Sequence, residues 1–155
     1  MRRHVDAETP PEADAQAVEL QKILKVLLPI RKQRLSRSER QQRQQEHALQ
    51  QCQQALREGE EKLADDRQHY QATTAAFLPD HQGKETAPGA LNSALDGEQQ
   101  QREEMLRQQQ QLSVLESAAR QQQARSEEAL REVQRCQRDV EKINYLLQNS
   151  EVTGS

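Results

Sequence analysis

Mostly apolar residues recur every seven positions along two long stretches of this chain, and a segment rich in proline and glycine separates the two stretches. The first series is Leu35, Gln42, Leu49, Leu56, Leu63, Tyr70 and Phe77, and the second is Met105, Leu112, Ala119, Ser126, Val133, Val140 and Leu147. A repeat of seven places such residues along one face of an α-helix. The pattern therefore predicts two long helices, each with a stripe that needs a partner.

Each stretch also carries a second stripe. In the first it is small or polar, with Gln45, Cys52, Gly59, Asp66 and Thr73, and in the second it is fuller, with Gln108, Leu115, Gln122, Ala129, Cys136 and Ile143. Two helices of similar length on either side of a link rich in proline and glycine suggest an antiparallel hairpin. The sequence therefore predicts an all-α fold: a long antiparallel two-helix coiled-coil hairpin with disordered termini.

The register of this hairpin is open. If Phe77 lies opposite Met105, then Tyr70 meets Leu112, and large residues face small ones in the middle of the seam, which favours close packing. A slide of one heptad in either direction also gives plausible layers. The slide that pairs Phe77 with Leu112 would bring Cys52 close to Cys136.

Prolines and glycines predict the boundaries of the elements. We expect a disordered tail at 1–13 and a single hairpin over 14–155. The first helix spans about 14–78 and is kinked at Pro29, since proline removes one main-chain hydrogen bond and clashes with the preceding turn. The link covers 79–97, where Pro79, Gly83, Pro88, Gly89 and Gly97 gather. The second helix spans about 98–148, and 149–155 form a short tail.

The composition narrows the classes of function. Hydrophobic residues make up 33% of the chain and aromatic residues 2%, against roughly 45–50% apolar residues in ordinary globular domains. So little large apolar volume cannot enclose a pocket, and no phosphate-binding loop or nucleophile motif is visible. We therefore expect no enzymatic activity and no cofactor. We also expect no membrane span and no secretory signal, since no long apolar run is found.

Charge is concentrated in one block. Residues 22–43 hold eight basic residues against one acidic residue, a net charge of +7, in a chain whose net charge is −3. The simplest interpretation of this block is a solvated helix flank. The second interpretation is an interface with an acidic protein partner, because the apolar stretch from Ile23 to Ile30 adjoins the arginines. Nucleic acid is a weaker reading, since no aromatic residue interleaves with the basic ones.

Cysteines and histidines do not form a metal site in this sequence. Cys52 and Cys136 both fall on the predicted seams, and neither has a Cys or His three or four residues away. We expect both to be free thiols with a structural role, since buried cysteines usually behave as small apolar residues.

The segment LQKILKVLLPIRKQRLSRSERQ, residues 20–41, resembles the opening of the FliJ/YscO family, the stalk proteins of flagellar and virulence type III secretion: an apolar helical start, a basic run and then leucine heptads. The stretch LADDRQHYQ, residues 63–71, followed by a break, is similar to the end of that family's first helix. In layout the resemblance covers residues 20–148. This chain departs from the family pattern in Pro29, in its acidic N-terminal tail and in its long link.

The resemblance implies a non-catalytic stalk or adaptor in the bacterial cytoplasm, at the cytoplasmic face of the secretion apparatus. It implies that the terminal end of the hairpin engages the hexameric secretion ATPase, and that the tip engages the export gate protein or secretion chaperones. The residues it assigns to the ATPase are Ile23, Leu24, Leu27, Leu28, Arg31, Arg34, Arg37, Arg40 and Arg43. Those it assigns to a partner at the tip are Tyr70, Phe77 and Leu78. The competing expectation is a generic structural coiled-coil scaffold, and a basic-arm nucleic-acid binder is the third.

Overall fold

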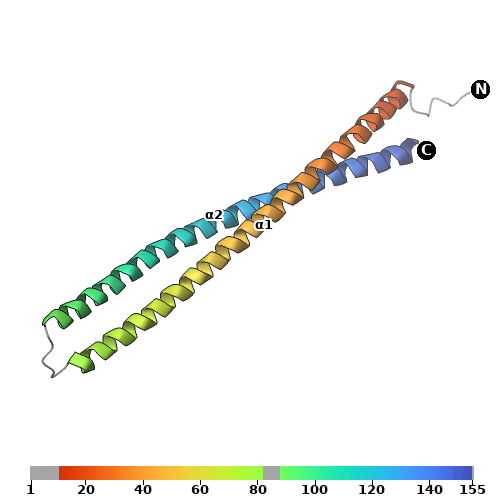
Figure 1. Ribbon diagram of the computed structural model, residues 1–155. Helices are drawn as coiled ribbons and strands as arrows, with labels where there is room; N and C mark the ends of the chain where they lie inside the picture. The colour runs from red at the N-terminus through yellow and green to blue at the C-terminus, as the bar shows by residue number, and fades with distance from the viewer. Residues whose placement is uncertain (1–10, 82–87, 155) are drawn as a thin grey trace, which may run out of the picture. The chain divides into compact units, whose positions relative to one another are not determined.

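Two long helices make up the described part of the chain. The structure, a computed structural model, describes residues 11–81 and 88–154 of the 155 residues. Helix α1 spans Pro11–His81 and helix α2 spans Pro88–Gly154. The two pack side by side and run in opposite directions (Figure 1). This confirms the predicted fold class, a long two-helix hairpin.

Both helices begin at a proline, and both are longer than the sequence predicted. Proline suits the first turn of a helix, because its φ is already helical and its missing N–H would have no partner there. Helix α2 begins at Pro88 rather than near residue 98 and continues to Gly154 rather than to 148. The glycines of 88–97 lower helix propensity by only about 1 kcal/mol each, so this segment is helical and not part of the link.

The other end of the link also differs slightly from the prediction. Helix α1 includes Pro79 and ends at His81, whereas we placed its end at residue 78. At its start, residues 11–13 are helical, and the rest of the predicted disordered tail, residues 1–10, lies outside the described residues, as do 82–87 and Ser155.

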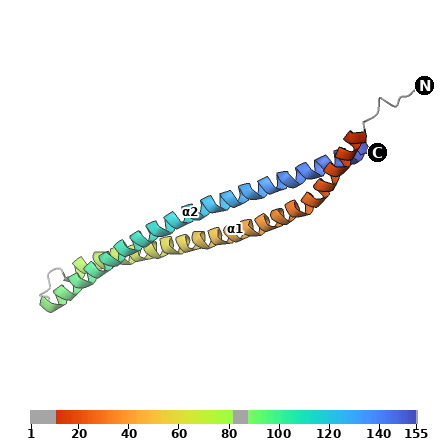
Figure 2. The same ribbon diagram turned by 90° about the horizontal axis from the view of Figure 1, so that it is seen from above.

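Helix α1 continues through Pro29 without interruption. Figure 2 shows α1 curving within its red-to-orange stretch, in which Pro29 lies. Bends of this kind are commonly found at a proline, which removes one main-chain hydrogen bond. Pro29 is exposed, so its ring does not disturb the contact with α2. Helix α1 is therefore a single helix that passes through Pro29.

The seam between the helices follows the predicted stripes. The buried hydrophobic residues are Leu24, Leu49, Leu63, Val133, Cys136, Val140 and Ile143, and the buried polar residues are Ser38, Gln108, Gln122 and Ser126. Leu35, Gln42, Leu56 and Tyr70 of the first predicted series are half-buried. Most of the chain's polar residues thus stay outside, and the apolar heptad positions face the partner helix.

The hairpin divides into two compact parts. The terminal part comprises Met1–Glu46 and Arg125–Ser155, and the link part comprises His47–Ala124. In the terminal part, the Ser126 hydroxyl donates a hydrogen bond to Glu46 Oε1 at 2.7 Å, and Arg31 Nη1 lies 3.7 Å from Asp139 Oδ2. These two contacts fix the pairing of the helices within this part.

In the link part, Gly59 sets the register. A Cβ atom built on Gly59 would lie 3.3 Å from both Leu112 Cδ1 and Leu115 Cδ1. Leu112 therefore faces Gly59 rather than Tyr70 or Phe77, and both of the registers written out from the sequence are wrong. The heptad stripes repeat along the whole helix, so they do not distinguish one slide from another. Gly59 does distinguish them, because its lack of a side chain lets two leucines of α2 approach closely at this one position.

The two cysteines are free. Cys136 is buried in the terminal part and Cys52 is half-buried in the link part. Both lie on the seams, as the sequence predicted.

Candidate protein-binding surface

The N-terminal stretch of α1 exposes most of its apolar side chains. Ile23 is 48% exposed, Val26 65% and Ile30 42%, and Val18 and Leu20 are also exposed. Leu27 and Leu28 are half-buried. Leu24, which the sequence also assigned to a partner, is 5% exposed and belongs to the core. Val26 and Ile30 were not among the residues assigned to the ATPase, although the heptad pattern leaves both off the seam and both are exposed.

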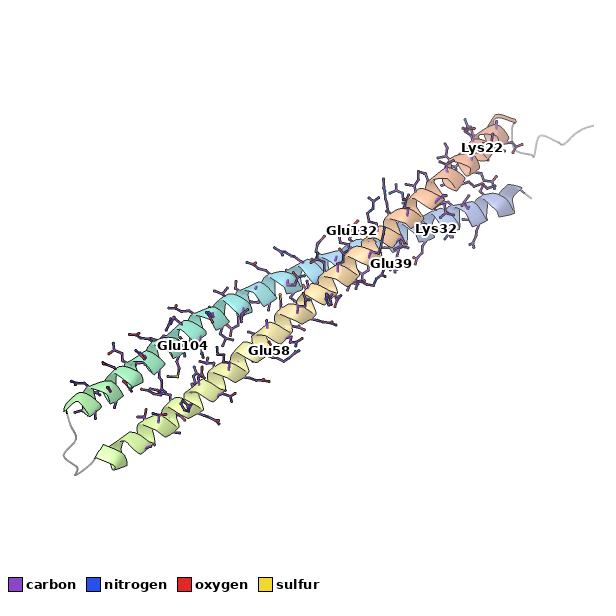
Figure 3. All side chains as sticks on the ribbon, viewed as in Figure 1. Lys22, Lys32, Glu39, Glu58, Glu104 and Glu132 are labelled. Atoms are coloured by element: carbon purple, nitrogen blue, oxygen red, sulfur yellow. The ribbon has the colours of Figure 1, made fainter. Side chains whose placement is uncertain are left out.

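The arginines that follow along α1 also differ in how exposed they are. Arg31 is half-buried on the seam and is paired with Asp139 of α2. The other four arginines of the block are exposed: Arg34, Arg37, Arg40 and Arg43. Within the described residues, none of these four makes an ion pair with a carboxylate. Figure 3 shows Lys22, Lys32 and Glu39 along the same stretch of α1.

Exposed apolar residues and arginines share one face of α1. A step of seven residues returns to nearly the same direction on a helix. Leu20 and Leu27 are followed by Arg34, Ile23 and Ile30 by Arg37, and Val26 by Gln33 and Arg40. We call the exposed members of these rows the outer face of α1: Leu20, Ile23, Val26, Ile30, Gln33, Arg34, Arg37 and Arg40. It is apolar toward the start of α1 and basic farther along, and Arg43 lies on a different row.

The arginines of α2 in the terminal part are arranged differently. Residues 125–150 hold five basic and five acidic residues. Arg131 pairs with Glu128, and Arg135 pairs with both Glu128 and Glu132. The hydrogen bond from Arg131, and then that from Arg135, lowers the pKa of Glu128 below its ordinary value. Positive charge on this stretch of α2 is therefore balanced locally, whereas that on the outer face of α1 is not.

Of the residues predicted to bind a partner at the tip, only the side chain of Tyr70 is described. It is half-buried, and its hydroxyl donates a hydrogen bond to Glu98 Oε1 at 2.5 Å. Glu98 also accepts a hydrogen bond from Arg102 Nη2 at 2.6 Å. The bond from Tyr70, ahead of that from Arg102, lowers the pKa of Glu98. Tyr70 thus ties α1 to α2, while the side chains of Phe77 and Leu78 lie outside the described residues.

No group of three or more histidine, cysteine, aspartate or glutamate side chains arranged to hold a metal ion occurs among the described residues. Within that same part of the chain, neither helix contains a stretch apolar enough to cross a bilayer.

Comparisons with protein family models, with curated proteins and with solved structures found no match to this chain.

Proposed function

We propose that this chain is a non-catalytic stalk or adaptor that docks the outer face of α1 onto an acidic, partly apolar surface of a protein ring, in the manner of the FliJ/YscO stalks of type III secretion. The ring is then the hexameric secretion ATPase. The observation that carries the proposal is the continuity, on one face of a long helix, of exposed apolar residues and of arginines that make no ion pair with a described residue.

The two halves of the outer face contribute differently to such an interface. Arginine binds carboxylates through a planar fork, often with two hydrogen bonds at once. Exposed charge pairs mainly raise the association rate, and each is worth up to about 1 kcal/mol. Ile23, Val26 and Ile30 supply apolar area, whose burial depends little on salt. A partner must therefore present an apolar groove next to a row of carboxylates.

The test is charge reversal with a matched control. Arg34→Glu, Arg37→Glu and Arg40→Glu, introduced together, should abolish stimulation of the cognate secretion ATPase, because three attractive contacts become repulsive. The control carries Arg120→Glu, Arg125→Glu and Arg138→Glu, three exposed arginines of α2 that make no ion pair among the described residues. The control should stimulate nearly as well as the unmodified chain, and circular dichroism should show equal helix content in all three proteins.

A second variant separates the apolar half from the basic half. Ile23→Ser, Val26→Ser and Ile30→Ser together should weaken binding to a similar extent at low and at high salt, whereas the arginine variant should lose most at low salt. If both triple variants stimulate the ATPase like the unmodified chain, the outer face is a solvated helix flank. The generic coiled-coil scaffold then becomes the better description.

A further inference from the structure

A cleft of about 610 Å³ opens between the helices in the link part, on the side nearer the link. Its lining from α1 is Thr73 and Thr74, and its lining from α2 is Ala94, Leu95, Gly97, Glu98, Gln101 and Arg102. Four of these eight residues, Thr73, Thr74, Ala94 and Gly97, have small side chains or none, which leaves the space unfilled. Its volume is within the range of about 300–1,000 Å³ that is usual for binding sites.

Apolar surface continues from this cleft along α2. Leu95 is 50% exposed and Leu91, one turn earlier, is 39% exposed. Leu91 precedes Glu98 by seven residues and so stands on a seam position, where the heptad pattern places a residue that packs against a partner helix. The apolar surface extends along the helix and is not one enclosed cavity. Its shape therefore suits another helix rather than a small molecule.

A smaller hollow of about 120 Å³ adjoins the cleft and shares Gln101 with it. It is also lined by Asp66, His69, Glu104 and Met105. The Gln101 Oε1 atom is buried and has no hydrogen-bond partner within the described part of the chain. Asp66 is half-buried, and no ion pair with a described residue holds it. Both groups are acceptors, and an acceptor that is buried without a donor, as Gln101 Oε1 is, destabilises the fold.

The charge around the cleft, like the two acceptors, favours a ligand that brings hydrogen-bond donors and positive charge. Between Gly89 and Met105, α2 carries Asp96, Glu98, Glu103 and Glu104 against the single cation Arg102, a net charge of −3. Arg102 itself is bound to Glu98, with which it forms an ion pair at 2.6 Å. An occupant that brings hydrogen-bond donors and positive charge would complement this surface.

We propose that this cleft binds an amphipathic helix of a partner protein, with small apolar side chains turned toward Leu95 and Gly97 and a lysine or arginine at its edge, near Asp66 and Gln101. The apolar residues bury Leu91 and Leu95, and the basic side chain donates to the two acceptors. The inference does not depend on the secretion role proposed above, because it involves the link part alone.

The experiment uses the full chain and a defined probe. The probe is a fluorescent helical peptide of about 18 residues, with alanine and leucine on one face and lysine on the flanks; a second peptide carries glutamate in place of lysine. Gly97→Leu fills the cleft, and Gly89→Leu is its control. Both glycines lie in α2 with no atom within 4 Å of an added Cβ, but only Gly97 lines the cleft.

Fluorescence anisotropy should show binding of the lysine peptide. We expect Gly97→Leu to weaken that binding by about tenfold or more, and Gly89→Leu to leave it unchanged within about twofold. Asp66→Asn should also weaken it, and the glutamate peptide should not bind. Equal binding by Gly97→Leu, or equal binding of both peptides, would overturn the proposal. So would tighter binding of a peptide with the sequence of residues 18–40, since the occupant would then be a second copy of this chain.

Discussion

The Tyr70 hydroxyl and the Glu98 carboxylate form a polar contact between the two helices, and this contact makes the stability of the link part sensitive to acid. Because hydrogen bonds from Tyr70 and Arg102 favour the ionised form, the pKa of Glu98 is lower in the folded chain than in the unfolded chain. The contribution of Glu98 to stability is therefore fully present above the ordinary glutamate pKa. It is lost as the pH falls below that value and through the lowered one.

Replacement of Tyr70 tests this directly. In Tyr70→Phe, the pKa of Glu98 should rise toward its ordinary value, because the largest cause of its lowering is removed. The midpoint of acid unfolding should move to higher pH. An NMR titration of the side-chain carboxyl carbon measures the pKa. Tyr145→Phe, at a tyrosine that is 63% exposed, is the control and should change nothing; an unchanged pKa in Tyr70→Phe would show that the phenol does not control Glu98.

At the scale of helices, the heptad pattern predicted which residues of each helix face the other helix. It did not predict where each helix begins or the register in which the two helices pair. The inward positions depend on a repeat that every turn reinforces, and residues such as Leu49, Leu63 and Val140 are buried as predicted. Boundaries depend on single residues: Pro88 and the glycines after it can end one helix or open the next. Register depends on particular contacts, such as that of Gly59 with two leucines and that of Glu46 with Ser126, which a sequence of similar heptads does not single out.

The outer face of α1 could also be predicted in part from the sequence. The basic block and the apolar stretch beside it are visible in the sequence, and the structure exposes most of both. Leu24 and Arg31 are exceptions, because they stand seven residues apart on a seam position and face α2. The cleft in the link part could not have been predicted. It depends on which small side chains of the two helices come to lie opposite each other, and hence on the register.

Pro29 gives a prediction for helix α1 as a whole. It stands in the helix interior and is exposed, so its cost to the helix is not repaid by a contact of its ring with α2. Pro29→Ala should restore one main-chain hydrogen bond and stabilise the chain against unfolding by up to about 3 kcal/mol. Urea unfolding followed by circular dichroism measures this. Ser36→Ala, one heptad later and also exposed, should shift stability by less than about 0.5 kcal/mol. A loss of stability in Pro29→Ala would show that the curvature of α1 is needed for its packing.

At the scale of the molecule, apolar burial is unequal between the two parts. Of the seven buried hydrophobic residues among those described, five belong to the terminal part, and only Leu49 and Leu63 belong to the link part. The buried polar residues differ as well: the terminal part has Ser38 and Ser126, both hydrogen-bonded. The link part has Gln108 and Gln122, and Gln108 Oε1 lacks a partner within the described residues. Each part opens locally according to the apolar contacts it must break.

We therefore expect the link part to exchange its amide hydrogens faster than the terminal part. Residues 101–111 and 133–143 of α2 make a fair comparison, because they lie at similar distances from its two ends at Pro88 and Gly154, so fraying alone would affect them equally. Hydrogen–deuterium exchange followed by mass spectrometry should find 133–143 the better protected. The variant Gln108→Leu should narrow the difference, because it removes a buried acceptor and adds an apolar seam residue, whereas Gln109→Leu, at an exposed position next to it, should not. Equal exchange in the two segments would mean that apolar burial does not determine where this hairpin opens. The expected order would instead show that the seam of the terminal part, with more buried apolar residues, opens less readily than the seam of the link part.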